Sequence, residues 1–180
     1  MEIKDIIKTG KAEAVNNALL EAASGGNFLV VKKLFKKRGD DIDVNAVNSS
    51  GQTALFQSSH IGHIGIVTFL LQIKGIDVNI PETTQGATSL YAASQYGHVE
   101  TVTILLGAEG IKVNESDKNG ATPLFIASQN NHIEIVKLLL GAEGIEINQP
   151  ANNGATPLGM AKQEKHTEIV QLLLAAGATQ

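Results

Sequence analysis

The sequence contains no cysteine and no tryptophan, and aromatic residues make up only 4% of it. The absence of cysteine excludes disulfide bonds and thiolate metal sites, and it fits a reducing compartment, which favours a cytoplasmic or other intracellular location. With so few aromatic side chains, a core must be built from Leu, Ile, Val and Ala, which suits packed helices. The 180 residues, 43% of them hydrophobic, are enough for one domain of ordinary size.

Charged residues are also few, at 18%, and the formal net charge is −4. This acidic balance argues against general nucleic-acid binding. The charge is uneven, because residues 1–38 contain eight Lys or Arg and four Asp or Glu, whereas residues 39–180 contain six and fourteen. We expect no secretory signal, since the first eleven residues lack an apolar core, and no membrane span, which needs about 20 mostly apolar residues.

The strongest pattern in the sequence is internal repetition. Copies of one phrase, Gly-x-Thr-x-Leu, begin at Gly51, Gly86, Gly120 and Gly154. The intervals between them are 35, 34 and 34 residues. A histidine recurs with the same intervals, at His63, His98, His132 and His166. A second phrase, Ile-x-(Val/Ile)-Asn, recurs with nearly the same intervals and ends at Asn45, Asn79, Asn114 and Asn148. A weaker fifth copy starts near Asn17, and periods of this length are typical of repeat proteins.

One unit of the repeat has the pattern of two short helices. Thr122 can cap the first helix, and Pro123 suits its first position, where a missing N–H does no harm, so a helix is predicted over residues 123–129. A second helix is predicted from Ile133 to the glycine at 141. Helices of seven or eight residues are unstable alone. The sequence therefore predicts that successive units stack in a row and bury their Leu and Ile side chains against one another.

These phrases resemble those of the ankyrin-repeat family. The resemblance is carried by Gly120-Ala-Thr-Pro-Leu124, Gly97-His98, Glu134-Ile-Val136, Leu138-Leu-Leu140 and Asp77-Val-Asn79. It covers residues 17–180 and implies an all-α solenoid of stacked helix-turn-helix units with β-hairpin finger loops. The His that usually follows Thr-Pro-Leu in the family is replaced here by Phe56, Tyr91, Phe125 and Gly159.

The repeat predicts a single domain, residues 1–180, with about five repeats. Their approximate bounds are 17–48, 49–82, 83–116, 117–150 and 151–180. Residues 1–16, with Ile3, Ile6 and Ile7 at helical spacing, are predicted to form an N-terminal capping helix. The last repeat is as apolar as an internal one, which predicts either a piece of a longer protein or association at this end. Without such association we expect a monomer.

The resemblance implies a non-catalytic module that needs no cofactor and binds another protein through the concave face formed by the fingers and first helices. The positions that vary in the family correspond here to Val47, Ser50, Gln52, His60, Ile61, Ala87, Gln95, Tyr96, Ser116, Lys118, Asn119, Gln129, Asn130, Asn152, Asn153, Gln163 and Glu164. Most of these side chains are amides or hydroxyls. We expect Tyr96 to be the main anchor, because aromatic residues often dominate the energetics of interfaces.

Two other functions stay open. The chain can be a targeting or regulatory segment of a larger enzyme or of a secreted effector. Alternatively, it can bind an anionic partner or nucleic acid through a basic patch formed by Lys32, Lys33, Lys36, Lys37 and Arg38. The simpler interpretation of this run is a solvated outer face of a helix, whose C-terminal dipole favours positive charge.

Two patterns that suggest chemistry have a structural explanation in the repeat. His60-Ile-Gly-His63 spells the HIGH sequence of class I aminoacyl-tRNA synthetases, but no strand precedes it, and Gly62-His63 is the predicted interhelical turn. The repeated histidines lie on units whose helices pack 8–10 Å apart or more, too far for them to share a metal ion. We therefore expect turn histidines that bond to the backbone, and no metal site.

Overall fold

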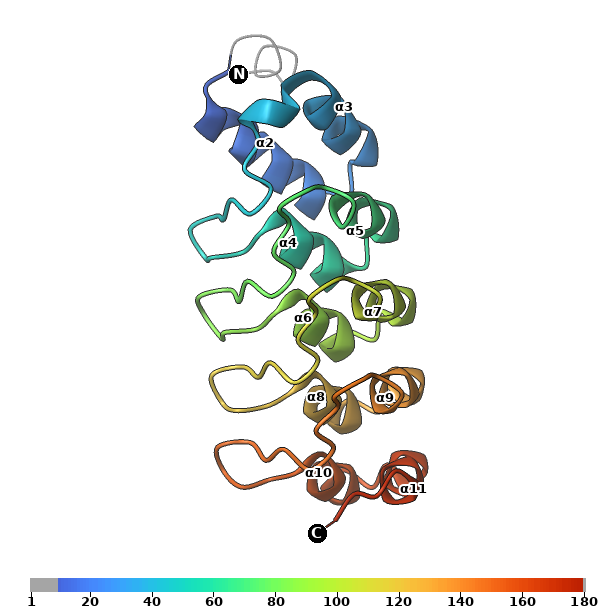
Figure 1. The fold of residues 1–180 in the computed structure, drawn as a ribbon. Helices are drawn as coiled ribbons and strands as arrows, with labels where there is room; N and C mark the ends of the chain where they lie inside the picture. The colour runs from blue at the N-terminus through green and yellow to red at the C-terminus, as the bar shows by residue number, and fades with distance from the viewer. Residues whose placement is uncertain (1–9, 180) are drawn as a thin grey trace.

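The computed structural model describes residues 10–179 and shows helix pairs stacked in a single row (Figure 1). In each pair an inner helix lies in front of an outer helix, and from the second pair on a loop that we call the finger projects to one side beside the inner helix (Figure 1). The inner helices are α2 (Ala12–Ser24), α4 (Ala54–Ile61), α6 (Ser89–Gln95), α8 (Pro123–Gln129) and α10 (Pro157–Gln163). The outer helices are α3 (Phe28–Arg38), α5 (Ile64–Leu70), α7 (Val99–Leu106), α9 (Ile133–Leu140) and α11 (Thr167–Ala175), and the short 3-10 helix η1 (Gly39–Asp41) follows α3. The predicted all-α solenoid is confirmed.

Threonine side chains set where the later inner helices begin. The hydroxyls of Thr53, Thr88, Thr122 and Thr156 accept hydrogen bonds from the backbone N–H three residues ahead, at 3.0–3.3 Å. Each bond satisfies a donor that the first helical turn leaves without a partner. In α8 the cap at Thr122, the proline at the first helical position and the helix bounds all agree with the sequence prediction.

Leucines form a continuous core between the two layers of helices. The inner helices contribute Leu55, Leu90, Leu124 and Leu158, and the outer helices contribute Leu70, Leu105, Leu139 and Leu173. Each of these side chains is at most 1% exposed. Burying one leucine side chain is worth roughly 1.5–3 kcal/mol of transfer free energy. Stacking therefore stabilises helices that are too short to persist alone.

The histidine of each interhelical turn connects its unit to the one before. The Nε2 atoms of His63, His98, His132 and His166 lie 2.9–3.3 Å from the carbonyl oxygens of Ser24, His60, Gln95 and Gln129, respectively. Because a carbonyl oxygen only accepts, Nε2 carries the hydrogen and donates it. These carbonyls lie at the C-terminal ends of inner helices, where they lack a partner within the helix. The predicted role of the turn histidines is confirmed.

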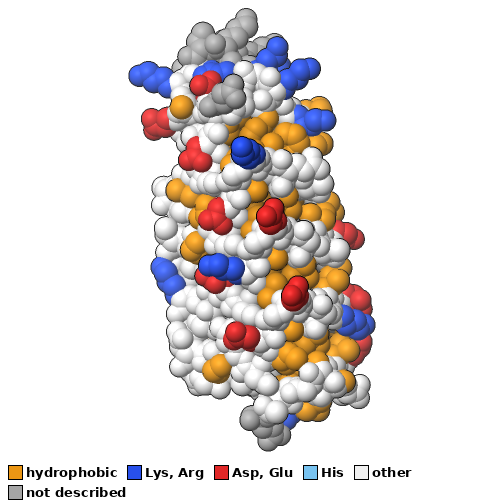
Figure 2. Space-filling view, in the orientation of Figure 1, with side chains coloured by type: hydrophobic (Ala, Val, Ile, Leu, Met, Phe, Trp, Pro, Cys, Tyr) orange, Lys and Arg blue, Asp and Glu red, His pale blue; other side chains and the backbone are white. Residues whose placement is uncertain are grey.

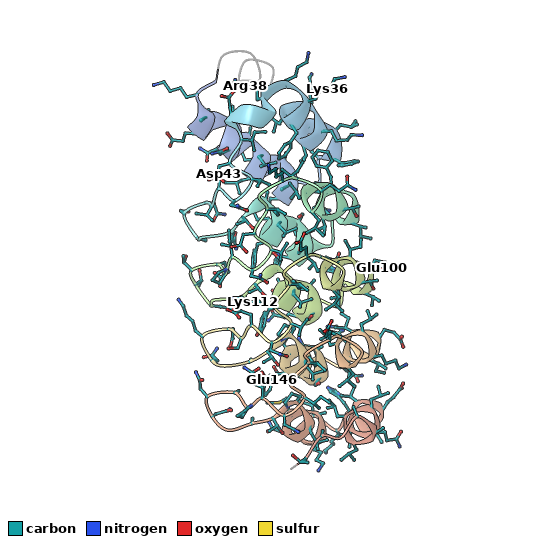
Figure 3. All side chains as sticks on the ribbon, in the orientation of Figure 1. Lys36, Arg38, Asp43, Glu100, Lys112 and Glu146 are labelled. Atoms are coloured by element: carbon teal, nitrogen blue, oxygen red, sulfur yellow. The ribbon has the colours of Figure 1, made fainter. Side chains whose placement is uncertain are left out.

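The asparagine of the second repeated phrase makes a further connection, toward the next unit. Asn79 donates through Nδ2 to the Gly110 carbonyl and accepts through Oδ1 from the Lys112 backbone N–H, at 2.8 and 2.9 Å. Asn45 and Asn114 make the same pair of bonds one unit away on either side. In this phrase the residue after the isoleucine has an equivalent position in each unit. Figure 3 shows three of these residues, Asp43, Lys112 and Glu146, in a row along the stack.

We expect Asn79→Ala to lower the free energy of unfolding by about 1–3 kcal/mol, because it removes two hydrogen bonds of about 0.5–1.5 kcal/mol each. Asn148→Ala is the matched control, since Asn148 has one such bond, from the Thr179 backbone N–H at 2.9 Å. The control should lose about half as much. Urea unfolding followed by circular dichroism measures both. Equal losses for the two variants would contradict the role given to the paired bonds.

The predicted β-hairpin form of the fingers is not confirmed. Among residues 10–179 there is no β-strand, and the one isolated antiparallel bridge joins Val47 to Thr53. A backbone hydrogen bond closes each finger, such as Asn48 N–H to the Gln52 carbonyl at 3.1 Å, and side-chain oxygens add further bonds. In the second unit, Asn48 Oδ1 accepts from the backbone N–H of Ser50 and Gln52 at 2.9 and 3.0 Å. The fingers are therefore tight turns with local caps.

The N-terminal unit also departs from the predicted boundaries. The boundary predicted between residues 16 and 17 falls inside α2, which is continuous from Ala12 to Ser24. No glycine or proline interrupts this segment, and Val15 and Leu19, one helical turn apart, are both buried in the core. Residues 12–16 therefore belong to the first inner helix. The rest of the predicted capping helix, with Ile3, Ile6 and Ile7, lies outside the described residues.

Candidate functional site

A pocket of about 220 Å³ lies between the second and third units, where their fingers meet the inner helices α4 and α6. Its lining residues are Gln52, Phe56, His60, Glu82, Thr84, Gln85, Ala87, Ala92, Gln95 and Tyr96. Glu82 is the one acidic residue of this lining, and no Lys or Arg is part of it. The pocket therefore combines aromatic rings, amide groups and a single carboxylate on the side of the fingers and inner helices.

Three aromatic rings form one wall of this pocket. The His60 ring stacks near the Phe56 ring, at 6.1 Å between centroids, and meets the Tyr96 ring edge-on at 4.3 Å. Tyr96 ends α6 and remains 52% exposed. Burial lowers the pKa of His60 and the nearby His98 lowers it further, so His60 is neutral at pH 7. The wall is therefore an uncharged apolar surface that is partly open to solvent.

Glu82 organises the finger that borders the pocket. It is 5% exposed, and its carboxylate accepts hydrogen bonds from the backbone N–H of Thr84, Gln85 and Ala87. Burial raises the pKa of Glu82, but the three backbone bonds outweigh burial, so the pKa lies below its ordinary range. Asn48 and Asp117 cap the neighbouring fingers in the same way. The finger of Glu82 is one residue longer, and the longer side chain of glutamate spans the difference.

We expect the stability that Glu82 contributes to vanish on acidification. Because its folded-state pKa is lowered, the contribution is present above the unfolded pKa of roughly 4.3 and is lost as the pH falls through the folded value. Wild-type protein should therefore lose more stability between pH 5 and pH 3 than Glu82→Gln does. Urea midpoints at pH 7, 5 and 3 measure this. The control Glu143→Gln, which removes an exposed loop carboxylate, should follow the wild type, and a Glu82→Gln profile parallel to wild type would disprove the assignment.

The sequence matches a known protein family over most of its length. Residues 19–117 and 90–180 each match the family described as "Ankyrin repeats (3 copies)". The chain belongs to the ankyrin-repeat family. Members of this family act through protein–protein interaction. The pocket lies on the surface of fingers and inner helices that the resemblance indicated.

Curated relatives match this ankyrin-repeat chain over shorter stretches. Osteoclast-stimulating factor 1 of Xenopus laevis is 35% identical over 69 residues, which are 38% of this chain and 31% of that protein. Human "Ankyrin repeat and SAM domain-containing protein 3" is 43% identical over 60 residues, which are 33% of this chain and 9% of that protein. The similar segment thus makes up less than a third of the relatives' own length.

Five of the predicted binding residues line the pocket, namely Gln52, His60, Ala87, Gln95 and Tyr96. Val47 in a finger and Ile61 at the end of α4 are 49% and 44% exposed, and neither lines this pocket. The remaining predicted residues lie at least partly exposed on later fingers and inner-helix ends, at Ser116, Lys118, Asn119, Gln129, Asn130, Asn152, Asn153, Gln163 and Glu164. Ala87 lines the pocket but is buried.

Several of these residues hold neighbouring ankyrin units together. Lys118 Nζ donates to the backbone carbonyls of Thr83 and Thr84 in the preceding finger. Asn152 donates through Nδ2 to the Lys118 carbonyl at 2.9 Å, and Asn130 donates in the same way to the Gln95 carbonyl at 3.0 Å. Ser50 also connects fingers, because its carbonyl accepts from the Thr83 backbone N–H. Polar groups at variable ankyrin positions thus form hydrogen bonds that connect neighbouring units along the row.

Sequence reasoning missed other parts of the pocket, namely Phe56, Glu82, Thr84, Gln85 and Ala92. The available signal was the segment from Asn79 to Gly86, which is one residue longer than its counterparts. A second hollow, of about 500 Å³, was also missed; it lies between α2 and α4 and includes Asn17, Glu21 and Gln57. Gln57 Oε1 is buried there without a hydrogen-bond partner in the described structure.

The predicted basic patch lies on the outer helix of the first ankyrin unit. Lys32, Lys33, Lys36 and Lys37 are exposed on α3, which contains no Asp or Glu. Figure 2 shows Lys and Arg side chains gathered at this end of the molecule. Arg38 differs from the lysines, because Nε bonds Asp41 at 2.7 Å and Nη2 donates to the Gly10 carbonyl. The run therefore comprises four exposed lysines and an arginine that fastens the end of α3.

Neither a membrane span nor a metal cluster is found in residues 10–179. None of the helices in this range has both the length and the hydropathy needed to cross a bilayer. Within the same range, no three side chains of His, Asp or Glu converge as metal ligands would.

Proposed function

We propose that this ankyrin-repeat chain is a non-catalytic module that binds a segment of another protein on its concave face, centred on the pocket between α4 and α6. The observation that carries the proposal is the half-exposed Tyr96 ring, held edge-on against His60 beside a pocket on this face. A ring that is already fixed loses little conformational entropy on binding. Tyrosine is also among the residues most enriched in the energetic centres of interfaces.

The pocket's composition indicates what kind of segment it would hold. The rings of His60 and Tyr96 offer contact area to one apolar or aromatic side chain of the partner, and the buried Phe56 ring supports His60 from behind. The amides of Gln52 and Gln95 border the same space and can both donate to and accept from a peptide backbone. A volume of about 220 Å³ suits a side chain rather than a whole cofactor. A short peptide with one apolar anchor fits these features.

A targeting or regulatory segment within a larger protein is the second candidate. It is supported by the relatives, of which the matched stretch makes up 31% and 9%. In that case the concave face would position another domain or its target, and the pocket would serve the same binding role. The two candidates differ in what is attached to the repeats, not in how the repeats bind.

A partner capture experiment tests the proposal. Proteins that bind immobilised wild-type chain would be identified by mass spectrometry, and the affinity of a purified partner would be measured by calorimetry. We expect Tyr96→Ala to weaken this affinity at least tenfold, because loss of a hot-spot aromatic removes about 2 kcal/mol or more. Leu174→Ala is the matched control, since Leu174 is 50% exposed but lies on the outer helix α11.

The two variants give a clear decision. Loss of binding with Tyr96→Ala and retention with Leu174→Ala support the concave pocket. If Tyr96→Ala bound the partner with unchanged affinity, the pocket would not be part of the interface. Both variants change exposed side chains, so thermal unfolding should show that they fold like the wild type.

A further inference from the structure

A second surface of unusual composition lies on the outer helices of the first two units. A groove of about 510 Å³ runs there between α3 and α5, and we call it the α3–α5 groove. Its lining residues are Leu29, Lys32, Lys33, Phe35, Lys36 and Phe69. None of them lines the concave pocket. The groove therefore is a separate candidate for binding.

Aromatic rings give the α3–α5 groove a firm floor. Phe69 of α5 packs edge-to-face against Phe28 at 6.0 Å and against Phe35 at 5.4 Å. Such pairs add about 0.5–1.5 kcal/mol beyond the area that they bury. Three of the five phenylalanines of the chain thus gather at this one place. The floor is an ordered apolar surface rather than a set of loose side chains.

Leu29 at the rim of the groove is 79% exposed, more than any other large hydrophobic side chain in the described residues. The equivalent position is Gly65 in α5, and in the last three outer helices it holds the exposed glutamates Glu100, Glu134 and Glu168. Glu100 points outward from α7 in Figure 3. A single exposed leucine is ordinary, but here it adjoins Phe28, which is 37% exposed, and an apolar floor. The first unit thus presents apolar surface where the last three units present charge.

The charge around the groove has one sign. Lys32, Lys33 and Lys36 line it, and α3 contributes no carboxylate. None of these lysines takes part in the salt bridges found in residues 10–179. The ammonium of Lys32 instead lies 5.4 Å from the centroid of the Phe28 ring. A partner with carboxylates around an apolar stripe would match both the floor and the rim.

We propose that the α3–α5 groove docks an acidic amphipathic helix of another protein. An apolar stripe with i, i+3, i+4 and i+7 spacing would lie on Phe69, Phe35 and Leu29, as helices bind in hydrophobic grooves elsewhere. Carboxylates beside that stripe would meet Lys32, Lys33 and Lys36. A lipid surface matches less well, because most of the apolar side chains line a groove and do not protrude.

The probe for this proposal is a synthetic helical peptide of about 18 residues, five turns long, with Leu along one stripe and Glu beside it. A second peptide has Lys in place of every Glu and the same stripe. Fluorescence anisotropy measures the binding of each labelled peptide to the full chain. We expect the acidic peptide to bind at least tenfold more tightly than the basic one, with affinity that falls as salt is raised, because exposed charges are screened.

Substitutions locate the binding. Leu29→Glu introduces the residue that three later units have at this position, so the variant should fold, and circular dichroism checks that it does. Leu29→Glu should weaken the binding of the acidic peptide at least tenfold, and Lys33→Glu should weaken the same binding. Tyr96→Ala should leave this binding unchanged, so the groove is tested independently of the concave pocket.

Several results would overturn the proposal. These are no binding of the acidic peptide, equal binding of both peptides, or full binding by Leu29→Glu. Binding to phosphatidylserine vesicles or to a single-stranded oligonucleotide, without binding of the acidic peptide, would assign the groove to a lipid surface or to nucleic acid instead. Sedimentation that shows self-association lost in Leu29→Glu, again without peptide binding, would assign it to a second copy of the chain.

Discussion

Leu105→Ala is expected to lower the free energy of unfolding by about 2–5 kcal/mol, the range found for deletion of a buried leucine side chain. Leu105 in α7 is fully buried and belongs to the leucine core between inner and outer helices. It also lies in the third unit of the row, so the loss weakens contacts with the units on both sides. Repeat arrays depend on such neighbour contacts, and about three repeats are needed for stability.

The control for this prediction is Leu174→Ala, which removes the same atoms from a side chain that is 50% exposed. Its effect should stay within about 0.5 kcal/mol, as for most surface substitutions. Urea unfolding followed by circular dichroism measures the free energy of unfolding of both variants. If the two variants lost equal stability, the leucine core would not be what holds the units together.

Gly120→Ala is expected to destabilise the protein by about 2–4 kcal/mol. Gly120 has a φ of +77°, which costs an L-residue about 1–2 kcal/mol. A Cβ at this position would also lie 2.8 Å from the backbone nitrogen of Asn152 and 2.7 Å from its Oδ1, both in the next finger. Backbone atoms cannot move aside as a flexible side chain can, so the fingers would have to separate.

Gly154 offers a matched control, because it opens the same Gly-Ala-Thr-Pro-Leu phrase one unit later. Its φ is +81°, but a Cβ there would meet nothing within 4 Å. Gly154→Ala should therefore show only the conformational cost of about 1–2 kcal/mol. The difference between the two variants, measured by chemical unfolding, isolates the contact between fingers. A difference near zero would show that the fingers adjust without loss.

The repeat allowed much of the fold to be predicted from the sequence. The bounds of α8 and the start of α9 follow from Thr122, Pro123 and the break after Gln129, because these are local effects of capping and backbone conformation. The predicted stacking of leucines follows from the same period. The β-hairpin form of the fingers is not confirmed, since each finger has too few backbone bonds to make strands, and a single sequence does not show how far such pairing extends.

The pocket could be predicted only in part. Tyr96, His60, Gln52 and Gln95 were found because they occupy positions that vary among ankyrin repeats. Glu82 was missed, because a lone glutamate in a loop has no pattern that indicates burial under three backbone N–H groups. The α3–α5 groove was recognised only as a basic run, since the approach of Phe69 to Phe28 and Phe35 depends on how α3 and α5 pack.

The His and Asn connections bear on how such a chain can change its length over evolution. Every junction between units uses the same two kinds of bond, so the groups that receive a neighbour are already present on each unit. Gene duplication or unequal crossover that inserts or deletes a whole unit would therefore create a junction with the same kinds of bond as the existing ones. Insertions of a partial unit would break that match, which makes the whole repeat the natural step of growth.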